Sequence, residues 1–232
     1  MGDAAAAPAS SSRLEAVIWD LDGTLLDTEQ LSTDATDEYI AQWTGRRVDW
    51  DLKQKTLGKR AVEWTPVVIG ELGLEQHTTP AELEAAWEAN LKKRYPGVQL
   101  MPGAEEVTSM LERLGVPQAL ATSSSAAAVA AKRLPHEALF ARFQHVVTGE
   151  MAARGKPAPD IFLEAAARLG VTRFLVVEDS LTGVQAGVAA GAVTVAVPDP
   201  RLDPGPFLDA GAAAVLRSLE DFDPAALGLE PQ

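Results

Sequence analysis

The sequence has no cysteine, few aromatic residues and a deficit of basic side chains. Phe, Trp and Tyr together make up 6% of its 232 residues. The absence of cysteine excludes disulfides, thiolate metal sites and cysteine nucleophiles. Twenty Lys and Arg face 33 Asp and Glu, which gives a net charge of −13. We therefore expect no nucleic-acid partner, because such proteins need a basic surface against the phosphate backbone.

Long hydrophobic runs are also missing, although 47% of the residues are hydrophobic. No segment approaches the roughly eighteen apolar residues that would span a bilayer, so we expect no membrane partner. The Ala/Ser-rich opening lacks the apolar centre of a secretory signal. We expect residues 1–13 to be a disordered tail and the protein to be a cytoplasmic monomer, with an organelle location still open.

Short apolar runs alternate with helical patterns over most of the chain. The runs that we expect to form strands are residues 14–19, 118–121, 174–177 and 192–197. The helical patterns between them cover residues 104–114, 126–134, 159–169 and 182–190. Apolar runs without polar alternation are typical of strands buried on both faces. The pattern predicts an α/β fold with a doubly wound, parallel, Rossmann-like sheet.

One long interval interrupts this alternation. Residues 28–99 contain no convincing strand but include helix-like segments at 32–43 and 80–95. An interval of this length exceeds a simple crossover, so we predict an inserted, all-helical cap domain. The segment Leu100-Met101-Pro102-Gly103 marks the return to the sheet. The catalytic core is then predicted to comprise residues 14–27 and 100–232.

Acidic and hydroxyl side chains follow three of the predicted strands. In an open parallel sheet, ligands bind beyond the carboxyl ends of the strands, so these side chains should meet at one edge. Four carboxylates at one edge repel one another unless a cation lies among them, and oxygen ligands suit Mg²⁺. The residues are Asp20 and Asp22 after the first strand, Thr122 and Ser123 after the second, and Glu178 and Asp179 after the third.

Each of these motifs has a simpler explanation when taken alone. Asp-x-Asp-Gly is most often a turn, and Thr122–Ser125 or Glu178-Asp179 could serve only as helix caps. Lys156 lies in a Gly-Lys-Pro-Ala-Pro segment that could be a solvated loop. Their joint occurrence, each at a strand end and with a lysine in a loop that two prolines stiffen, favours a site for phosphoryl chemistry.

These residues resemble the motifs of haloacid dehalogenase-type hydrolases. Asp20-Leu21-Asp22-Gly23-Thr24-Leu25-Leu26-Asp27 is similar to the first motif of that family. Thr122 corresponds to the second motif, Lys156 to the third, and Glu178-Asp179 to the acidic fourth. The likeness runs from about residue 14 to the end of the chain. It implies a Mg²⁺-dependent phosphatase for a small phosphomonoester.

The resemblance also implies a role for each residue. Asp20 would attack phosphorus and form an aspartyl-phosphate, and Asp22 would act as general acid and then general base. Mg²⁺ would be held by Asp20, the main-chain carbonyl of Asp22, and Asp179, with Glu178 in or near its shell. The phosphoryl oxygens would be bound by Thr122, Ser123 and Lys156.

Within the family, the sequence most resembles a group of pseudouridine-5′-phosphatases, glycerol-3-phosphatases and plant FMN hydrolases. This group implies FMN, pseudouridine 5′-phosphate and glycerol 3-phosphate as candidate substrates. Asp22 disfavours dehalogenation, which needs no acid for the leaving group. Two alternatives remain open: a sugar-phosphate mutase, although Ser32 stands where mutases tend to carry His, and a regulatory protein that binds metal and phosphate without turnover.

The predicted cap carries one further candidate site. Its loop at residues 56–60 resembles the substrate-specificity loop of the family, and Lys59 or Arg60 could contact the non-reacting part of the substrate. Four of the five tryptophans, Trp43, Trp50, Trp64 and Trp87, also lie in the cap. Their helical spacing favours packing in its core over stacking on a flat ligand.

Overall fold

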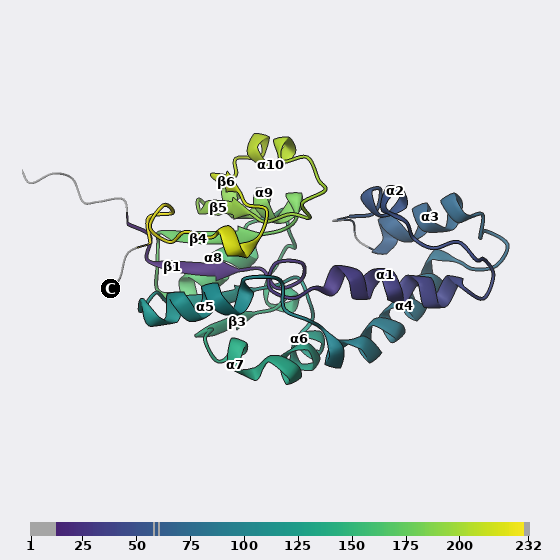
Figure 1. Ribbon diagram of the computed structural model, residues 1–232, viewed down its shortest axis with the longest axis horizontal. Coiled ribbons are helices and arrows are strands. Elements are labelled where there is room, and N and C mark those ends of the chain that lie inside the picture. Colours follow the sequence, from purple (N-terminus) through teal and green to yellow (C-terminus); the bar gives the residue numbers. More distant parts are fainter. Residues whose placement is uncertain (1–12, 58, 60, 230–232) are drawn as a thin grey trace, which may run out of the picture.

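A computed structural model describes residues 13–57, 59 and 61–229. It consists of an α/β core and a helical cap, which extends from one end of the core (Figure 1). Apart from Arg13, the expected N-terminal tail lies outside the described residues. Among the helices of the described chain, none has the length and apolar character needed to cross a bilayer.

The core is built on a six-stranded sheet in which all pairings are parallel. The strand order β3-β2-β1-β4-β5-β6 is that of a Rossmann-like, doubly wound sheet. The chain therefore winds outward in one direction from β1 and then in the other from β4, which leaves a switch point between them. The strands are β1 (Ala16–Trp19), β2 (Gln118–Ala121), β3 (His145–Val147), β4 (Phe174–Glu178), β5 (Val193–Ala196) and β6 (Ala214–Val215).

Helices cover both faces of the sheet, as the apolar strands require. Val17 and Trp19 of β1 pack into one apolar cluster, while Ala16 and Ile18 pack into another on the opposite face. The first cluster includes side chains of α5 (Ala104–Arg113), α6 (Ala126–Arg133) and α7 (Glu137–Phe140). The second includes side chains of α8 (Asp160–Leu169) and α9 (Leu181–Ala189). The remaining core elements are α10 (Gly205–Asp209) and the 3-10 turns η2 (Leu134–His136), η3 (Gly149–Met151) and η4 (Leu219–Asp221).

Trp19, directly before the first acidic motif, is fully buried. Its indole Nε1 donates to Oε1 of Gln118 at 3.0 Å, and the Gln118 amide in turn donates to the Thr108 carbonyl at 2.9 Å. The indole ring lies 5.7 Å from the ring of Phe222. The large residue therefore fills the core and links β1 to β2, with its polar atom satisfied.

The cap forms from the chain between β1 and α5, and the described part of this segment contains helices without a strand. Its elements are α1 (Thr28–Ile40), α2 (Trp50–Gln54), α3 (Ala61–Leu72), α4 (Pro80–Arg94) and η1 (Tyr95–Gly97). Helices α1 and α4 run side by side along the cap (Figure 1). The outgoing and returning chains pair at the base, where Asp27 N donates to Gln99 O and Met101 N donates to Leu25 O. These two hydrogen bonds hold the two connecting segments together at the base of the cap.

The cap tryptophans mainly pack against other cap side chains. Trp43 and Trp64 pack against an apolar cluster that includes Ile40 and Leu83. Trp87 meets Trp64 edge-to-face at 5.6 Å, and its Nε1 donates to Oγ of Ser32 at 3.1 Å. These contacts confirm the packing interpretation for three of the four tryptophans. The fourth, Trp50, contacts the α/β core instead.

Candidate active site

The predicted site residues meet at the switch point of the sheet. Strand β1 lies between β2 and β4, so the ends of all three strands are adjacent. The first residue beyond β1, Asp20, is fixed by a hydrogen bond from its backbone N to the Val177 carbonyl at 3.0 Å. Parallel pairing therefore brings together residues that are more than 150 positions apart in the sequence, such as Asp20 and Asp179.

Three carboxylates form a compact cluster at this edge. Asp20, Glu178 and Asp179 each place an oxygen within 4.8 Å of the others. Burial raises the pKa of Asp20 to about 7; Lys156 opposes the shift, and the charges of Glu178 and Asp22 add to it. Burial, followed by the charges of Glu178 and Asp20, also raises the pKa of Asp179 well above its usual range. The surroundings therefore do not fully stabilise the negative charge that the three carboxylates would carry if all were ionised.

Lys156 is the cation that touches this cluster. Its Nζ lies 2.5 Å from Oδ1 of Asp20 and 2.5 Å from Oε1 of Glu178, and its side chain is only 7% exposed. Burial alone would lower the pKa of Lys156, but the charges of Asp20 and Glu178 raise it instead. The ammonium group is therefore charged and fixed between two strand ends. No hydrogen bond within the described chain reaches the carboxylate of the third acid, Asp179.

Two glycines allow the carboxylates to approach the backbone. Gly23 has a φ of +85°, and a Cβ built on it would lie 2.2 Å from Oδ2 of Asp179. A Cβ on Gly183, in α9, would lie 1.8 Å from the Glu178 carboxyl carbon. Both distances are far inside van der Waals contact. The Gly of the first motif is therefore needed for space beside Asp179 as well as for its left-handed backbone conformation.

The Asp22 side chain is not part of the three-carboxylate cluster and has partners of its own. Its Oδ1 lies 2.5 Å from Nζ of Lys132, and its Oδ2 accepts hydrogen bonds from Ser124 at 2.7 Å and Thr122 at 3.3 Å. Burial acts to raise the pKa of Asp22, but the Lys132 charge and the hydrogen bonds from Lys132 and Ser124 lower it overall. The four predicted carboxylates thus divide into a group of three and one that is paired with Lys132.

Sequence reasoning missed Lys132. It lies on α6, ten residues beyond Thr122, in a helix whose other residues are mostly Ala. A lysine in the last turn of a helix normally interacts with the helix dipole at the surface, so its position carried no signal. Only the fold shows that α6 directs this side chain inward, to where it meets Asp22.

The hydroxyl residues after β2 divide between the site and the next helix. Thr122 is buried, accepts a hydrogen bond from Ser124 N at 3.1 Å and contacts Asp22. The N-cap of α6 is Ser125, and that of α9 is Ser180. Ser125 and Ser180 therefore cap the helices, and the Thr122 hydroxyl is available to the site. The second predicted hydroxyl residue, Ser123, is exposed at the same strand end.

Of the two cap candidates, Lys59 is exposed, and Arg60 lies outside the described residues. A contact between cap and core lies elsewhere, on the loop after β5. The guanidinium of Arg201 sits 3.6 Å from the ring centroid of Trp50 in α2, and it also pairs with Asp199 at 2.6 Å. This cation–π contact connects the cap to the catalytic edge of the core.

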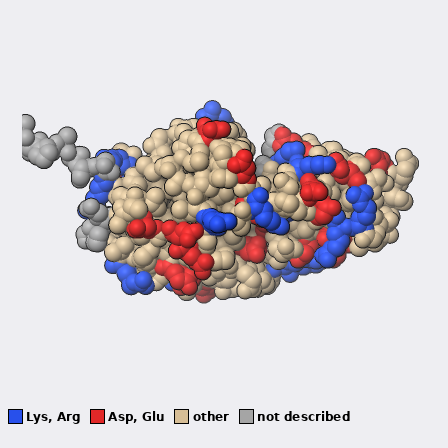
Figure 2. All heavy atoms as spheres, turned by 45° about the horizontal axis from the view of Figure 1, so that its top comes forward, with Lys and Arg blue, Asp and Glu red and all other residues tan. Residues whose placement is uncertain are grey.

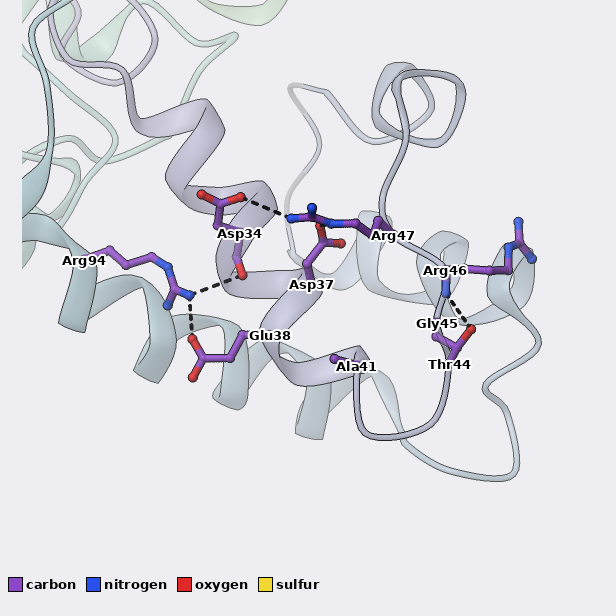
Figure 3. Close-up of a pocket in the computed structure, with 9 residues that line it drawn as sticks. All are labelled: Asp34, Asp37, Glu38, Ala41, Thr44, Gly45, Arg46, Arg47 and Arg94. Carbon is purple, nitrogen blue, oxygen red and sulfur yellow. Dashed lines mark hydrogen bonds and ion pairs between the residues drawn. The ribbon is translucent and has the colours of Figure 1, made fainter.

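A small cavity of about 240 Å³ adjoins the phosphate-binding candidates and is lined by Ser123 and Lys156 among others. A larger one of about 640 Å³ lies on the cap, and Figure 3 shows its nine lining residues. Its three arginines already have partners: Arg47 pairs with Asp37, Arg94 with Glu38, and Arg46 donates to the Glu71 carbonyl. No predicted site residue lines the cap cavity, so its size does not make it the catalytic centre.

Charged side chains are unevenly distributed over the face that Figure 2 shows. In the view of Figure 2, Lys and Arg alternate with Asp and Glu over the cap, whereas the core shows clustered acids and broad uncharged areas. The positive charge near the site comes from buried lysines. Attraction for a phosphate ester must therefore arise locally.

Comparison with known proteins adds the family context. The family model for haloacid dehalogenase-like hydrolases matches residues 14–191. The chain is 35% identical to (DL)-glycerol-3-phosphatase 2 of Arabidopsis thaliana, over 100% of this chain and 98% of that protein. It is 40% identical to a probable pseudouridine-5′-phosphatase of Drosophila melanogaster, over 91% and 93% of the two chains. A bifunctional riboflavin kinase/FMN phosphatase of Arabidopsis thaliana is 36% identical over 93% of this chain and 56% of its own length.

Solved structures share the whole arrangement. A haloacid dehalogenase family hydrolase from Deinococcus radiodurans, solved with bound phosphate and sodium, superposes with a TM-score of 0.78 at 27% identity. That match covers 96% of this chain and all of the other. A putative beta-phosphoglucomutase from Thermotoga maritima gives a TM-score of 0.73 at 28% identity, over 89% and 96% of the two chains. These matches include the cap as well as the sheet.

Proposed function

The chain belongs to the haloacid dehalogenase-like hydrolase family and is a phosphoric monoester hydrolase, and we propose that it is Mg²⁺-dependent and acts through Asp20 on a small phosphomonoester. One observation carries this proposal. Three strand-end carboxylates lie within 4.8 Å of one another at the switch point, with Lys156 bonded to two of them. This is an arrangement suited to hold a phosphoryl group beside a carboxylate nucleophile.

In the first step, an oxygen of Asp20 attacks phosphorus and the bond from phosphorus to the ester oxygen breaks. The negative charge of the bound ester raises the pKa of Asp22, so that Asp22 binds a proton in the complex. Asp22 donates this proton to the departing oxygen, so that an alcohol leaves and an aspartyl-phosphate remains on Asp20. Lys156 and Thr122, with Ser123 beside them, hold the phosphoryl oxygens and stabilise their developing charge. Two positions support these roles: Thr122 directly follows β2, which pairs with β1, and Nζ of Lys156 contacts Asp20.

In the second step, a water molecule attacks the phosphorus of the aspartyl-phosphate. Asp22, now a carboxylate, accepts the proton of this water, and the bond to Asp20 breaks to release inorganic phosphate. One residue can serve in both steps because it ends the first step in the state that the second requires. The position of Asp22, two residues from the nucleophile, supports this double role.

The residues at the site fit a divalent cation. When ionised, the four carboxylates carry two more charges than the two lysines paired with them, and one divalent ion balances this excess. The carboxylates are those of Asp20, Asp22, Glu178 and Asp179. The donors are all oxygens, which Mg²⁺ prefers. Asp20, Asp179 and the main-chain carbonyl of Asp22 would hold it, while Glu178 is largely committed to Lys156 and Ser180. A bound Mg²⁺ would neutralise charge on the phosphoryl group and the nucleophile.

The cap would enclose the ester and exclude bulk water during the reaction. We place its boundaries at residues 28 and 99, since the hydrogen bond between Asp27 and Gln99 marks its base. The proposed contacts for the non-reacting part of the substrate remain Lys59 and Arg60. Relatives are named as phosphatases of glycerol 3-phosphate, pseudouridine 5′-phosphate and FMN. We therefore propose that the substrate is a small alcohol, nucleoside or flavin phosphate.

Hydrolysis is favoured over the mutase reaction by the surroundings of Ser32. The Ser32 hydroxyl accepts a hydrogen bond from Nε1 of Trp87, which ties α1 to α4. This position therefore serves cap packing, with no imidazole available to exchange a proton with a sugar. A mutase would isomerise a sugar phosphate without net release of phosphate, and that outcome would contradict the proposal.

The test is phosphate release from a panel of these esters, measured with Mg²⁺ and with excess chelator. We expect at least one ester to be hydrolysed only with Mg²⁺, and Asp20→Asn to lower its turnover by about 1,000-fold or more, because the nucleophile is lost. Asp209→Asn, an exposed acid on α10, is the matched control and should retain wild-type turnover. Substantial turnover in Asp20→Asn, or in the presence of chelator, would contradict the proposal.

A further inference from the structure

Lys132 is a buried lysine beside a residue of the proposed chemistry, and the reaction as described above gives it no task. Only 2% of its surface is exposed, although lysine is among the residue types that proteins bury least. Its Nζ contacts Asp22 at 2.5 Å and the Ser124 hydroxyl at 2.8 Å. Burying an ammonium group costs free energy unless it is paired, and here its charged partner is Asp22.

The position of Lys132 is fixed by well-packed neighbours. Helix α6 begins at the Ser125 cap, and its Val129 packs in the apolar cluster against one face of the sheet. The Lys132 ammonium lies 5.0 Å from the ring centroid of Tyr95, the residue that begins η1 at the end of the cap. The Tyr95 side chain is itself buried. Lys132 thus sits between a packed aromatic ring and Asp22, with little freedom to move.

Lys132 and Ser124 together determine where the Asp22 carboxylate lies. Lys132 binds Oδ1, Ser124 donates to Oδ2, and Lys132 also donates to the Ser124 hydroxyl. Both oxygens of Asp22 therefore have partners outside the cluster of Asp20, Glu178 and Asp179. Without these partners, repulsion from Asp20 and solvent exposure would leave the Asp22 side chain free to adopt other rotamers.

We propose that Lys132 is a positioning residue, which with Ser124 holds Asp22 where it can reach the leaving oxygen of the ester. The inference rests on the proposed function, because it takes the acid–base role of Asp22 from there. It also makes a statement about geometry alone: the Asp22 side chain keeps its place because Lys132 is present. The two statements can be tested separately.

A positioning role has a kinetic consequence that a purely structural role lacks. An alkyl ester such as glycerol 3-phosphate needs a proton on its departing oxygen, whereas p-nitrophenyl phosphate releases a stable nitrophenolate without one. Loss of a correctly placed acid should therefore slow the first step far more for the alkyl ester. General unfolding or loss of phosphate binding would slow both esters by the same factor.

The experiment compares Lys132→Met with the wild type on both esters in the presence of Mg²⁺. For glycerol 3-phosphate, kcat should fall by about 100-fold, within the usual contribution of general acid catalysis. The pre-steady-state burst of nitrophenolate, which reports the first step alone, should fall by no more than about 10-fold. Lys92→Met, an exposed lysine on α4, is the matched control and should change neither rate. Equal losses for the two esters would overturn the proposal.

Ser124→Ala provides a second variant in case Lys132→Met does not fold. It removes a hydroxyl bonded to both Asp22 and Lys132 while leaving their charges paired. We expect the same preference for the activated ester, with a difference of about five-fold, corresponding to one lost hydrogen bond. A uniform loss in Ser124→Ala would again count against positioning.

Crystal structures of the wild type and Lys132→Met test the geometry without reference to activity. In the wild type, the Asp22 carboxylate should accept hydrogen bonds from Thr122 and Ser124. In the variant, it should leave that position or occupy several rotamers. An unchanged Asp22 in Lys132→Met would overturn the positioning role even in an active enzyme. Conversely, a displaced Asp22 in a protein that hydrolyses no ester would refute the proposed function while supporting the geometry.

Discussion

Gly23 shows how closely single residues are fitted at this site. Its φ of +85° suits glycine, and the space where a side chain would begin is taken by the Asp179 carboxylate, 2.2 Å away. A substitution here would affect both backbone conformation and the place of a proposed metal ligand. Gly73 has a similar φ of +68°, but a Cβ added there would meet nothing within 4 Å. A substitution at Gly73 therefore measures the effect on the backbone conformation alone.

We predict that Gly23→Ala raises the Mg²⁺ concentration needed for half-maximal activity by about ten-fold or more, because Asp179 must move. Both Gly23→Ala and Gly73→Ala should lose about 1 kcal/mol of stability from the left-handed backbone. Magnesium titrations of activity, together with urea unfolding of both variants, provide the measurement. Equal Mg²⁺ requirements in the two variants would show that Asp179 does not depend on the space beside Gly23.

The sequence predicted the residues of the site better than their arrangement. The sequence predicted one site from residues that directly follow a predicted strand or lie in a stiff motif, because parallel pairing brings strand ends together. These residues are Asp20, Thr122, Lys156, Glu178 and Asp179. The pairing of Asp22 with Lys132 was not predictable. It depends on the direction in which one side chain leaves α6, and no local pattern records that direction.

At the scale of elements, the helices over the sheet were predictable from their apolar periodicity. Strands β3 and β6 were not predicted, because they have three and two residues and are only partly buried. The pairing of β3 with β2 and of β6 with β5 holds them in place more than their own sequence does. Helices α2 and α3 of the cap were missed as well; α2 has only five residues, and α3 contains Pro66.

Arg142, two residues beyond the end of α7, binds side chains of helix α5. Its guanidinium pairs with Glu105 and donates to Thr108 at 3.1 Å, and its side chain is only 10% exposed. The hydrogen bonds from Arg142 lower the pKa of Glu105, although burial acts in the opposite direction. Because the folded pKa is lowered, this pair stabilises the fold above the unfolded pKa of Glu105. The stabilisation is lost as the pH falls through the folded value.

Replacing Arg142 with Met should therefore destabilise the protein more at neutral pH than in acid. We expect the electrostatic part to be about 1 kcal/mol at pH 7, since the Glu105 side chain is half exposed, and to fade below about pH 4. Urea unfolding at both pH values measures it. Arg168→Met, which breaks an exposed pair with Glu164, is the control and should show a smaller difference. A loss that is the same at both pH values would assign the effect to packing alone.

At the scale of the whole molecule, the cap and core meet away from their covalent connections through Arg201 and Trp50. The guanidinium lies 3.6 Å from the indole centroid, and Asp199 orients it through a salt bridge. An exposed cation–π contact is weak, but it is enough to shift the balance between open and closed caps by about two- to five-fold. The two residues are 151 positions apart in the sequence, and the sequence analysis did not predict the contact.

Arg201→Gln should therefore lower kcat/KM by about two- to five-fold for a hydrolysed ester, because the closed cap is less populated. Arg217→Gln, another exposed arginine of the core, should leave kcat/KM unchanged. The measurement is steady-state kinetics with thermal unfolding alongside. A loss above about 100-fold would mean that Arg201 touches the substrate itself, and no loss would mean that the contact does not influence the cap.

The net charge of the molecule also affects how it can bind a substrate. A net charge of −13 repels a phosphate ester, and Lys132 and Lys156 are each already paired with carboxylates. In the proposed mechanism, the Mg²⁺ held by the acidic cluster would supply the remaining attraction. This explains how a strongly acidic protein can act on an anionic substrate.

The most direct test is the anomalous scattering of crystals soaked in Mn²⁺, an ion that shares the preference of Mg²⁺ for oxygen ligands. We predict one strong peak at the switch point, in contact with Asp20 and Asp179, and its loss in Asp179→Asn. A peak elsewhere, or a switch point without one at millimolar Mn²⁺, would contradict the account.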